Sequence, residues 1–318
     1  MTLTMKLTTP VEFPESEVKI SCGDRIMILG SCFADNIGKK LKERGFDVCL
    51  NPFGTLYNPA SIADSIARLD SGEHFTERDC VQMGSGSSKW CSFHHHTLSA
   101  RESVEEFLAT ANESLDMASR FWKDCRKVIV TLGTSWCYRH LGESGNSGGA
   151  SDEVCAMETA ANGGIIVANC LKRDAKEFRR EFLPAEVTER IVRGIVSGHP
   201  EKEFIFTVSP IRHFKDGAHG NQLSKANLLM GLDEAINQVR NKETAFGRSP
   251  RCDYFPAYEI MLDELRDYRF YAEDMIHPSE QAISYIFERF IDWALPKSEM
   301  EEFRRREKVF KHSQHIQR

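Results

Sequence analysis

Two side chains that can act as nucleophiles stand side by side where an apolar run ends. The run RIMIL, residues 25–29, is followed by Gly30, Ser31 and Cys32, and a helical pattern begins at about residue 34. A thiol near a helix N-terminus is activated because the helix dipole stabilises the thiolate and lowers the thiol pKa. The same letters also fit a helix-capping serine beside a small buried cysteine. By itself this turn indicates either a nucleophile or a helix start.

A candidate general base stands late in the chain. Asp274 and His277 are three residues apart, directly before a helical pattern that opens near residues 278–279. A carboxylate can hold an imidazole in one tautomer, and the imidazole can then take a proton from a nucleophile. An Asp and a His on a surface turn before a helix that starts with proline would look the same. The spacing alone is a weak signal.

Four more residues of chemical interest follow other strand-like runs. Gly54 and Ser135 are candidate oxyanion-hole residues, because a glycine lets a backbone N–H approach an oxyanion and a side-chain donor can add a second bond. Turn formation would explain the same residues. Arg212 could bind an acidic group of a substrate, and His213 could do so too or compete as the base. Three aromatic side chains could line a pocket: Phe53, Tyr57 and Trp136.

Strand-like and helical patterns alternate along the chain. The strand-like runs are 25–29, 46–50, 127–132, 204–208 and, more weakly, 252–255. The helical patterns lie at about 34–44, 59–69, 101–120, 174–197, 222–241, 257–266 and 279–294. This alternation predicts an α/β fold with a mostly parallel sheet covered on both faces. Ligands of open α/β sheets bind outside the carboxyl ends of the strands, and the candidate side chains gather there.

One large domain with loop insertions is expected over residues 1–296 of the 318. A highly charged tail follows at 297–318, which we expect to form an exposed helix with a frayed end. The Gly- and Ser-rich segment 140–153 and the segment 214–222 are predicted to be surface loops.

The composition argues against several classes of protein. The net charge of −6 is unlike a general nucleic-acid-binding surface, and no run approaches the ~18 apolar residues of a membrane span. The N-terminus lacks the apolar core of a signal peptide. The ten cysteines contain no CxxC pair, which argues against structural zinc and indicates free thiols in a reducing compartment, so a cytoplasmic location is expected. His94, His95 and His96 are adjacent and cannot all face one ion from regular structure, so no metal is expected.

The stretch Gly30-Ser31-Cys32-Phe33-Ala34 matches the motif that names the GSCFA family, and this family resembles the SGNH hydrolases. The resemblance runs from about residue 11 to about residue 295. It includes four further blocks in order: NPFGTLYNP at 51–59, TLGTSW at 131–136, SPIRH at 209–213 and FYAEDMIHPS at 270–279. The fold that it implies is a three-layer α/β/α sandwich of flavodoxin-like character.

The resemblance also implies roles for single residues. In register with the SGNH blocks, Cys32 falls at the nucleophile position, and a shift by one residue would make Ser31 the attacking group. Gly54 matches the oxyanion-hole glycine, and Ser135 stands where the family pattern has an asparagine. The last block supplies the base and the residue that orients it, and its matching positions are His277 and Asp274.

The implied activity is that of an esterase or acyltransferase that forms an acyl-enzyme on Cys32 or Ser31. We expect its substrate to be a small-molecule or glycan acyl ester and its acceptor to be water or a sugar hydroxyl, with no cofactor. One alternative is a non-catalytic module of the same fold that binds a carbohydrate or a CoA-like anion at the helix N-terminus. Another is a structural or assembly protein that uses the charged tail. The oligomeric state stays open.

Overall fold

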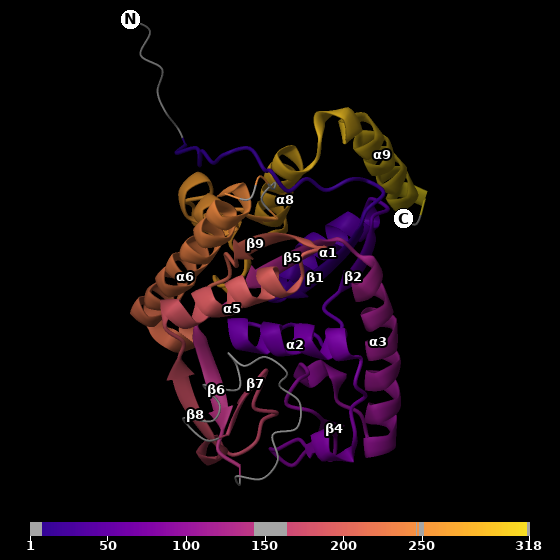
Figure 1. Cartoon of the computed structure of the whole chain (residues 1–318), viewed down its shortest axis with the longest axis vertical. Coiled ribbons are helices and arrows are strands. Elements are labelled where there is room, and N and C mark those ends of the chain that lie inside the picture. Colours follow the sequence, from indigo (N-terminus) through magenta and orange to yellow (C-terminus); the bar gives the residue numbers. More distant parts are fainter. Residues whose placement is uncertain (1–7, 143–163, 246, 248–250, 317–318) are drawn as a thin grey trace, which may run out of the picture.

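The computed structural model describes residues 8–142, 164–245, 247 and 251–316. A five-stranded parallel sheet lies at its centre, in the order β10-β9-β5-β1-β2 (Figure 1). Its strands are β1 (Arg25–Gly30), β2 (Asp47–Leu50), β5 (Lys127–Leu132), β9 (Glu203–Val208) and β10 (Cys252–Tyr254). Counted along the chain this is the order 2-1-3-4-5 of flavodoxin-like sheets. The order changes direction between β1 and β5, so a ligand site is expected outside their carboxyl ends.

Successive side chains of the central strands enter two separate cores. In β1, Ile26 and Ile28 pack on one side of the sheet, and Met27 and Leu29 pack on the other. Both faces are buried, which is why these strands are apolar throughout instead of alternating with polar residues. The predicted three-layer α/β/α sandwich is therefore confirmed.

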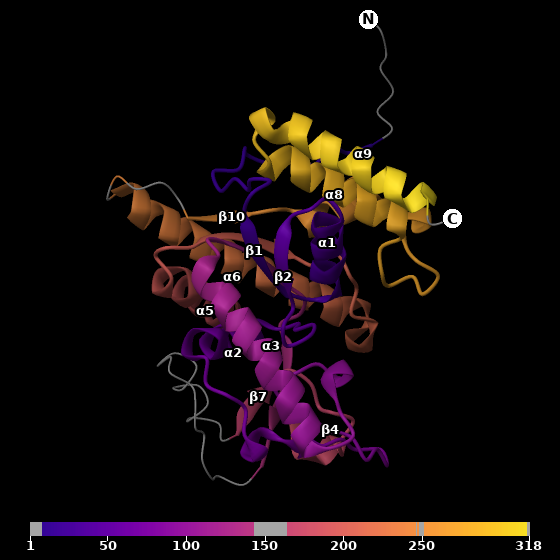
Figure 2. The same cartoon turned by 90° about the vertical axis from the view of Figure 1, so that its right-hand side faces the viewer.

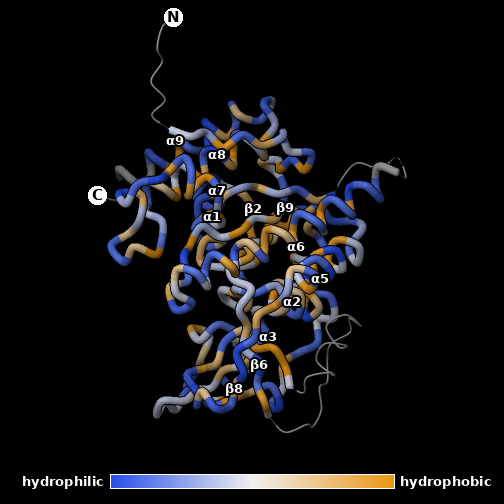
Figure 3. The backbone as a smooth tube through the Cα atoms, turned by 90° about the vertical axis from the view of Figure 1, so that its left-hand side faces the viewer, coloured by the Kyte–Doolittle hydropathy of each residue, from blue (hydrophilic) through white to orange (hydrophobic). Residues whose placement is uncertain are grey.

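Helices cover both faces of this sheet. Helices α1 (Cys32–Glu43) and α8 (Glu280–Ala294) share a core with Ile26 and Ile28. The opposite face is covered by α2 (Pro59–Ser71), α3 (Val104–Asp124), α5 (Ala185–Gly198) and α6 (Gly217–Ala245). Figure 3 shows hydrophobic positions gathered around α2, α5 and α6. The short helix α7 (Ala257–Glu259) continues into a π-helical turn, Ile260–Glu264. None of the described helices is long and apolar enough to cross a membrane.

A second region lies beside the parallel sheet and is built from antiparallel strands. It holds a three-stranded sheet in the order β7-β6-β8 and a two-stranded sheet of β3 and β4. These strands are β3 (Val81–Gln82), β4 (Trp90–Cys91), β6 (Trp136–His140), β7 (Ile165–Val167) and β8 (Phe178–Phe182). Helix α3 contacts both β1 and β4 and so joins the two regions (Figures 1 and 2). We call residues 73–103, 136–142 and 164–183 the antiparallel region.

The five predicted strands are confirmed, and two of the other predictions need correction. The helix predicted at 174–197 is wrong in its first half, because strand β8 occupies Phe178–Phe182 and α5 begins only after Pro184. The loop predicted at 214–222 is a short 3-10 turn followed by the start of α6 at Gly217. Of the loop predicted at 140–153, residues 143–153 lie outside the described part of the chain.

The charged tail is helical, as predicted, but it is docked instead of free. Helix α9 (Met300–Ile316) buries Phe303 between Phe46 and Phe287, with ring centroids 6.4 Å apart in both pairs. The Arg306 guanidinium donates to the carbonyls of Cys22 and Gly45 at 2.9 and 3.0 Å. The inner face of α9 is therefore part of the fold.

Candidate active site

The turn between β1 and α1 needs a glycine. Gly30 has φ +136°, and a Cβ added there would lie 2.2 Å from the Thr131 carbonyl oxygen of β5. Only a residue without a side chain lets the ends of the two strands approach this closely. The Ser31 N–H donates to the same oxygen at 3.3 Å. The first helix therefore starts directly at the point where the strand order changes direction.

Ser31 and Cys32 have different environments. Ser31 is 1% exposed and caps α1, because its hydroxyl accepts a hydrogen bond from the Phe33 N–H at 3.3 Å. Cys32 is the first residue of the helix and is partly exposed. Among the hydrogen bonds of the described residues, none uses the Cys32 N–H, which is one of the orphan donors of a first helical turn. The thiol is thus the accessible group of the pair.

A phenol stands next to this thiol. The Tyr57 hydroxyl lies 3.3 Å from Cys32 Sγ and 3.2 Å from Thr55 Oγ1. Burial, together with the hydrogen bond to Cys32, raises the pKa of Tyr57 to about 12. The Tyr57 carbonyl accepts hydrogen bonds from the N–H groups of Gly133 and Thr134 at 2.8 and 2.9 Å. The end of β5 therefore holds a protonated phenol against the thiol.

The Asp274–His277 pair forms a closed turn. One Asp274 oxygen lies 2.6 Å from His277 Nδ1, and the other accepts from the N–H groups of Ile276 and His277 at 2.9 Å each. These hydrogen bonds, first of all the one from the His277 N–H, lower the pKa of Asp274 to about 2. Met275 has φ +57°, as such a tight turn requires. With Nδ1–H assigned to the carboxylate, His277 Nε2 is left as the acceptor.

The chain segment after β9 connects this turn to the phenol. The Arg212 N–H donates to the Ile276 carbonyl at 3.3 Å. The imidazole ring of the next residue, His213, packs edge to face against the Tyr57 ring, with ring centroids 6.0 Å apart. Burial, and to a smaller extent the charges of Lys225 and His277, lowers the pKa of His213 to about 3. The neutral His213 thus packs beside Tyr57, and it is not a base for chemistry at neutral pH.

The hydrogen bonds of the described residues do not join the base to the nucleophile. The Cys32 thiol has its hydrogen-bond contact with Tyr57, whereas the His277 ring has its hydrogen bond with Asp274. Cys32 and Ile276, the neighbour of His277, border the same apolar cluster. Catalytic hydrogen bonds are often long before substrate binds, so the arrangement is compatible with a Cys–His–Asp triad that tightens on a substrate.

Two residues that sequence patterns did not single out hold the strand ends in place. Lys225 of α6 is fully buried, and its Nζ donates to the carbonyls of Gly133 and Ser209 at 2.6 and 2.8 Å. Burial lowers the pKa of this ammonium group to about 7. Asn51 accepts from the Gly30 N–H at 2.8 Å and donates to Asp35 at 2.7 Å. Lys225 has no sequence signal, because a lysine within a helix is normally at the surface.

Both predicted oxyanion-hole residues have other partners in the structure. The Gly54 N–H donates to the Asn51 carbonyl at 2.8 Å, and a Cβ on Gly54 would lie 2.5 Å from the Cβ of His96. Ser135 is 0% exposed, and its hydroxyl donates to the Ser224 carbonyl at 3.0 Å and accepts from Asn227 at 3.1 Å. Their roles here are a turn and a buried polar network, and neither presents a free donor.

The remaining predicted residues lie elsewhere. Trp136 packs its ring in the antiparallel region against Phe182, with centroids 4.8 Å apart, and under the Arg180 guanidinium, 4.0 Å away. Phe53 is buried, 2% exposed, and touches His95 and Phe75 edge to face. Among the ring contacts of the described residues, none joins Phe53 or Trp136 to Tyr57 or His213, so both rings contribute to packing.

The histidine triplet divides among three roles. His94 pairs with Asp64 at 2.5 Å, and His95 is buried with its Nδ1 2.7 Å from the Ser92 hydroxyl. His96 accepts from the Leu98 N–H at 3.3 Å. Within residues 8–142, 164–245, 247 and 251–316, no group of three His, Cys, Asp or Glu side chains has the arrangement of a metal site.

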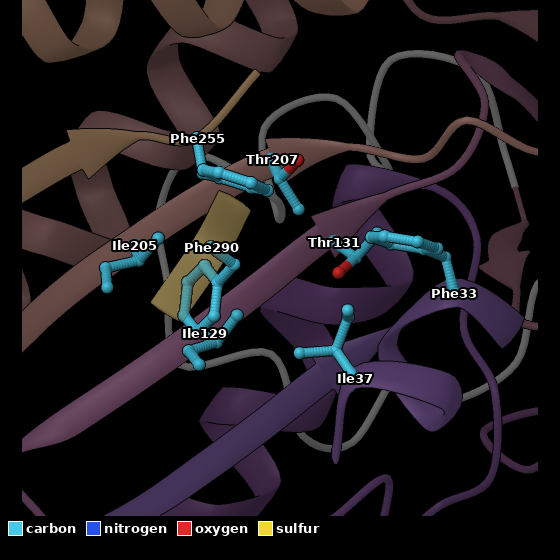
Figure 4. A pocket seen from close by; sticks show the side chains of 8 residues that line it. All are labelled: Phe33, Ile37, Ile129, Thr131, Ile205, Thr207, Phe255 and Phe290. Carbon is cyan, nitrogen blue, oxygen red and sulfur yellow. The ribbon is translucent and has the colours of Figure 1, made fainter. Parts of the chain in front are cut away.

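The small cavity shown in Figure 4 is part of the core and lies between the parallel sheet and helices α1 and α8. Its volume is about 10 Å³, which is close to the space of one water molecule. It is lined by Phe33, Ile37, Ile129, Thr131, Ile205, Thr207, Phe255 and Phe290. The reactive side chains described above are absent from this lining, so the cavity has no part in the candidate site.

The other described cysteines differ from Cys32 in chemical surroundings. All nine described cysteines are free thiols. Burial raises the pKa of Cys49, Cys91 and Cys125 to about 11 and that of Cys252 to about 12. These thiols are inert small apolar groups at neutral pH.

Fold and site together define a class of protein. It is a flavodoxin-like α/β/α sandwich with a thiol, a phenol and an oriented His–Asp pair at its strand ends. The model of the GSCFA family matches residues 25–290, which is more than half of the chain, and the chain belongs to this family. No curated protein and no solved structure matches the chain.

Proposed function

We propose that the protein is an esterase or acyltransferase that forms a thioester acyl-enzyme on Cys32. The observation that carries the proposal is the placement of an accessible thiol at the N-terminus of α1, at the switch point of the sheet, within 3.3 Å of the Tyr57 phenol. The resemblance of the GSCFA motif to SGNH hydrolases supports the same chemistry. The closed turn of Asp274 and His277 supplies a base whose Nε2 is unoccupied.

The reaction starts with proton transfer from the Cys32 thiol to His277 Nε2. The thiolate attacks the ester carbonyl, the C–O bond to the leaving alcohol breaks, and the imidazolium returns its proton to that alcohol. Asp274 stabilises the imidazolium that forms between these steps. Water or a sugar hydroxyl then attacks the thioester, with His277 taking its proton, and the free thiol is restored. The same residues thus serve hydrolysis and transfer.

The oxyanion that forms on the carbonyl needs donors, and Gly54 and Ser135 present none. The Cys32 N–H is unpaired, and the Tyr57 hydroxyl is protonated, so we assign the oxyanion donors to these two groups. Tyr57 thereby takes the place of the asparagine that the SGNH pattern has and this chain lacks. The substrate class, an acyl ester of a small molecule or glycan, rests on the family resemblance, and the free thiols support a reducing, cytoplasmic setting.

The test is a short pulse with an activated acetyl ester, followed by an acid quench, intact-protein mass spectrometry and peptide mapping. A single acetyl adduct on Cys32 is expected, and the His277→Ala variant should lose it. An adduct on Ser31 would keep the reaction class and contradict the thiol as its nucleophile. Slow labelling of many cysteines alike, with no dependence on His277, would overturn the proposal.

One observation favours a second function. Gly54 and Ser135, the two positions that would form the oxyanion hole in SGNH enzymes, are both occupied by structural hydrogen bonds. A protein that keeps the fold and only binds a carbohydrate or a CoA-like anion would tolerate this loss. Such a binding module would bind its ligand equally well with Cys32→Ala, and its Cys32 alkylation would not depend on His277.

A further inference from the structure

An arginine beside the candidate active site has no partner for its charge. Arg212 is partly buried, and its Nε is inaccessible and without an acceptor. Among the hydrogen bonds and ion pairs of the described residues, none involves the Arg212 guanidinium, whose closest aromatic contact is Phe214, 5.2 Å from the ring centroid. Comparable arginines of this chain are paired: Arg139 with Glu181, Arg251 with Glu243 and Arg289 with Glu264.

The acidic groups near Arg212 are already engaged. Asp274 holds His277, and Asp216 pairs with Arg180. Glu259 accepts from the Tyr254 hydroxyl at 2.8 and 2.9 Å. Burying the Arg212 Nε without an acceptor is costly, and none of the carboxylate hydrogen bonds and ion pairs of the described residues offsets this cost.

Two more nitrogen atoms, one on the turn after β9 and one in the first turns of α6, lack partners. The Asn221 side chain is 1% exposed; it accepts from the His213 N–H at 2.9 Å, but its Nδ2 has no acceptor. His213 Nε2 is buried and also without a partner. Native proteins rarely leave buried polar groups unpaired, and a common ligand would account for these three, which lie on the turn after β9 and at the start of α6.

The ligand chemistry follows from these donors. A guanidinium fork matches the two oxygens of a carboxylate, and the amide and imidazole N–H groups are further donors to oxygen. We propose that Arg212, His213 and Asn221, which we call the donor cluster, bind a carboxylate on the acyl part of the substrate. The inference rests on the proposed acyl transfer through Cys32 and makes it selective for half-esters of dicarboxylic acids or for similar anionic acyl groups.

The position of the cluster fits this role. Arg212 is tied to the catalytic turn through the Ile276 carbonyl, and His213 touches the same Tyr57 ring whose hydroxyl lies at Cys32 Sγ. The simplest substrate of this kind is a short half-ester with a few carbon atoms between its ester carbonyl and its carboxylate.

The test compares two probes, mono-4-nitrophenyl succinate, which carries a free carboxylate, and its neutral methyl ester. Stopped-flow release of nitrophenolate gives the acylation rates, and mass spectrometry confirms the adduct on Cys32. Wild type should prefer the anionic probe by about 10- to 100-fold, the range of charge-assisted hydrogen bonds. Arg212→Gln should reduce this ratio to near one, and Arg212→Lys should restore part of it. The exposed arginine of α9 gives the matched control, Arg304→Gln, which should keep the wild-type ratio.

Three outcomes would overturn the inference. Equal rates for the two probes in wild type would contradict it while leaving the acyl-enzyme proposal intact. Loss of folding in Arg212→Gln, seen as a large fall in its melting temperature, would show a structural role for the guanidinium. If neither probe acylates Cys32, the proposed function fails, and calorimetric titration of the Cys32→Ala protein then tests the donor cluster alone. Binding of succinate that Arg212→Gln abolishes would support it, whereas binding of inorganic phosphate without succinate would contradict the carboxylate assignment.

Discussion

The described residues form four His–Asp pairs, and two of them, one beside the parallel sheet and one at the antiparallel region, differ in that only the first has the surroundings of a candidate active site. His94 and Asp64 lie 2.5 Å apart, and His277 and Asp274 lie 2.6 Å apart. His94 is packed against the Phe75 ring with no described nucleophile as its partner. His277 lies on a half-exposed turn tied to the segment that contacts Tyr57. A His–Asp hydrogen bond by itself therefore does not identify an active site. Its position relative to the strand ends decides whether it can act on a nucleophile.

The same contrast holds for cysteines. Cys32 stands at the carboxyl end of a parallel strand, partly exposed, beside a phenol. Cys91 stands in a strand of the antiparallel region, fully buried, with its pKa raised to about 11 by burial. At the carboxyl ends of parallel strands, loops and helix N-termini are exposed together. The strands of the antiparallel region instead pack their side chains into a core.

The largest effect is expected from removal of the nucleophile. Cys32→Ala should abolish acyl-enzyme formation entirely, because no thiolate remains at the helix N-terminus. The matched change in the other region, Cys91→Ala, should leave the acyl-enzyme intact and lower stability only slightly. Peptide mapping after the acetyl pulse measures both. If the Cys32→Ala protein still formed an acetyl adduct in normal yield, the parallel sheet would no longer be distinguished from the antiparallel region by its nucleophile.

The two histidine pairs should separate activity from stability. His277→Ala should slow acylation of Cys32 by roughly 10²- to 10⁴-fold with little change in stability, since general-base catalysis contributes that range and the pair is half-exposed. His94→Ala should keep the acylation rate and lower the free energy of unfolding by about 1–3 kcal/mol, because Asp64 loses its partner. Pulse kinetics and urea titrations of both variants are the measurements. Equal acylation rates in the two variants would contradict the contrast.

A smaller effect is expected at the phenol. Tyr57→Phe removes one hydrogen-bond donor at the position of the oxyanion and should slow acylation by about 10²-fold, toward the low end for such donors. The exposed Tyr138 of β6 provides the control, and Tyr138→Phe should have the wild-type rate. If Tyr57→Phe acylates normally, the oxyanion lies elsewhere and the phenol only packs.

The smallest expected effect concerns pH and the antiparallel region. Burial lowers the pKa of His95 to about 3, so the unfolded chain binds a proton below its ordinary pKa of about 6.5 while the folded protein does not. The stability that His95 contributes is therefore present above pH 6.5 and is lost as the pH falls toward 3. Between pH 6.5 and 5 the loss should be about 2 kcal/mol. Urea titrations at these two pH values should show a smaller loss for His95→Asn than for wild type, and an equal loss would contradict the assignment.

Much of the fold and part of the site followed from the sequence. Apolar runs flanked by helical patterns located all five parallel strands, because strands buried on both faces must be apolar throughout. The antiparallel region was missed. Its strands are short, as in Trp90–Cys91, or heavily charged, as in Phe178–Phe182, and such segments have no distinct period.

The sequence by itself determined which residues end the parallel strands, and it predicted that Cys32, Tyr57, His213 and His277 gather near these ends. Only the tertiary structure decided what each of them does. It buried Ser31 as a cap, gave the Gly54 and Ser135 donors to other acceptors, and left Arg212 without a counter-charge. Strand ends follow from local patterns, whereas hydrogen-bond partners and burial depend on contacts between segments distant in the chain, and these decide which polar groups remain free for a ligand.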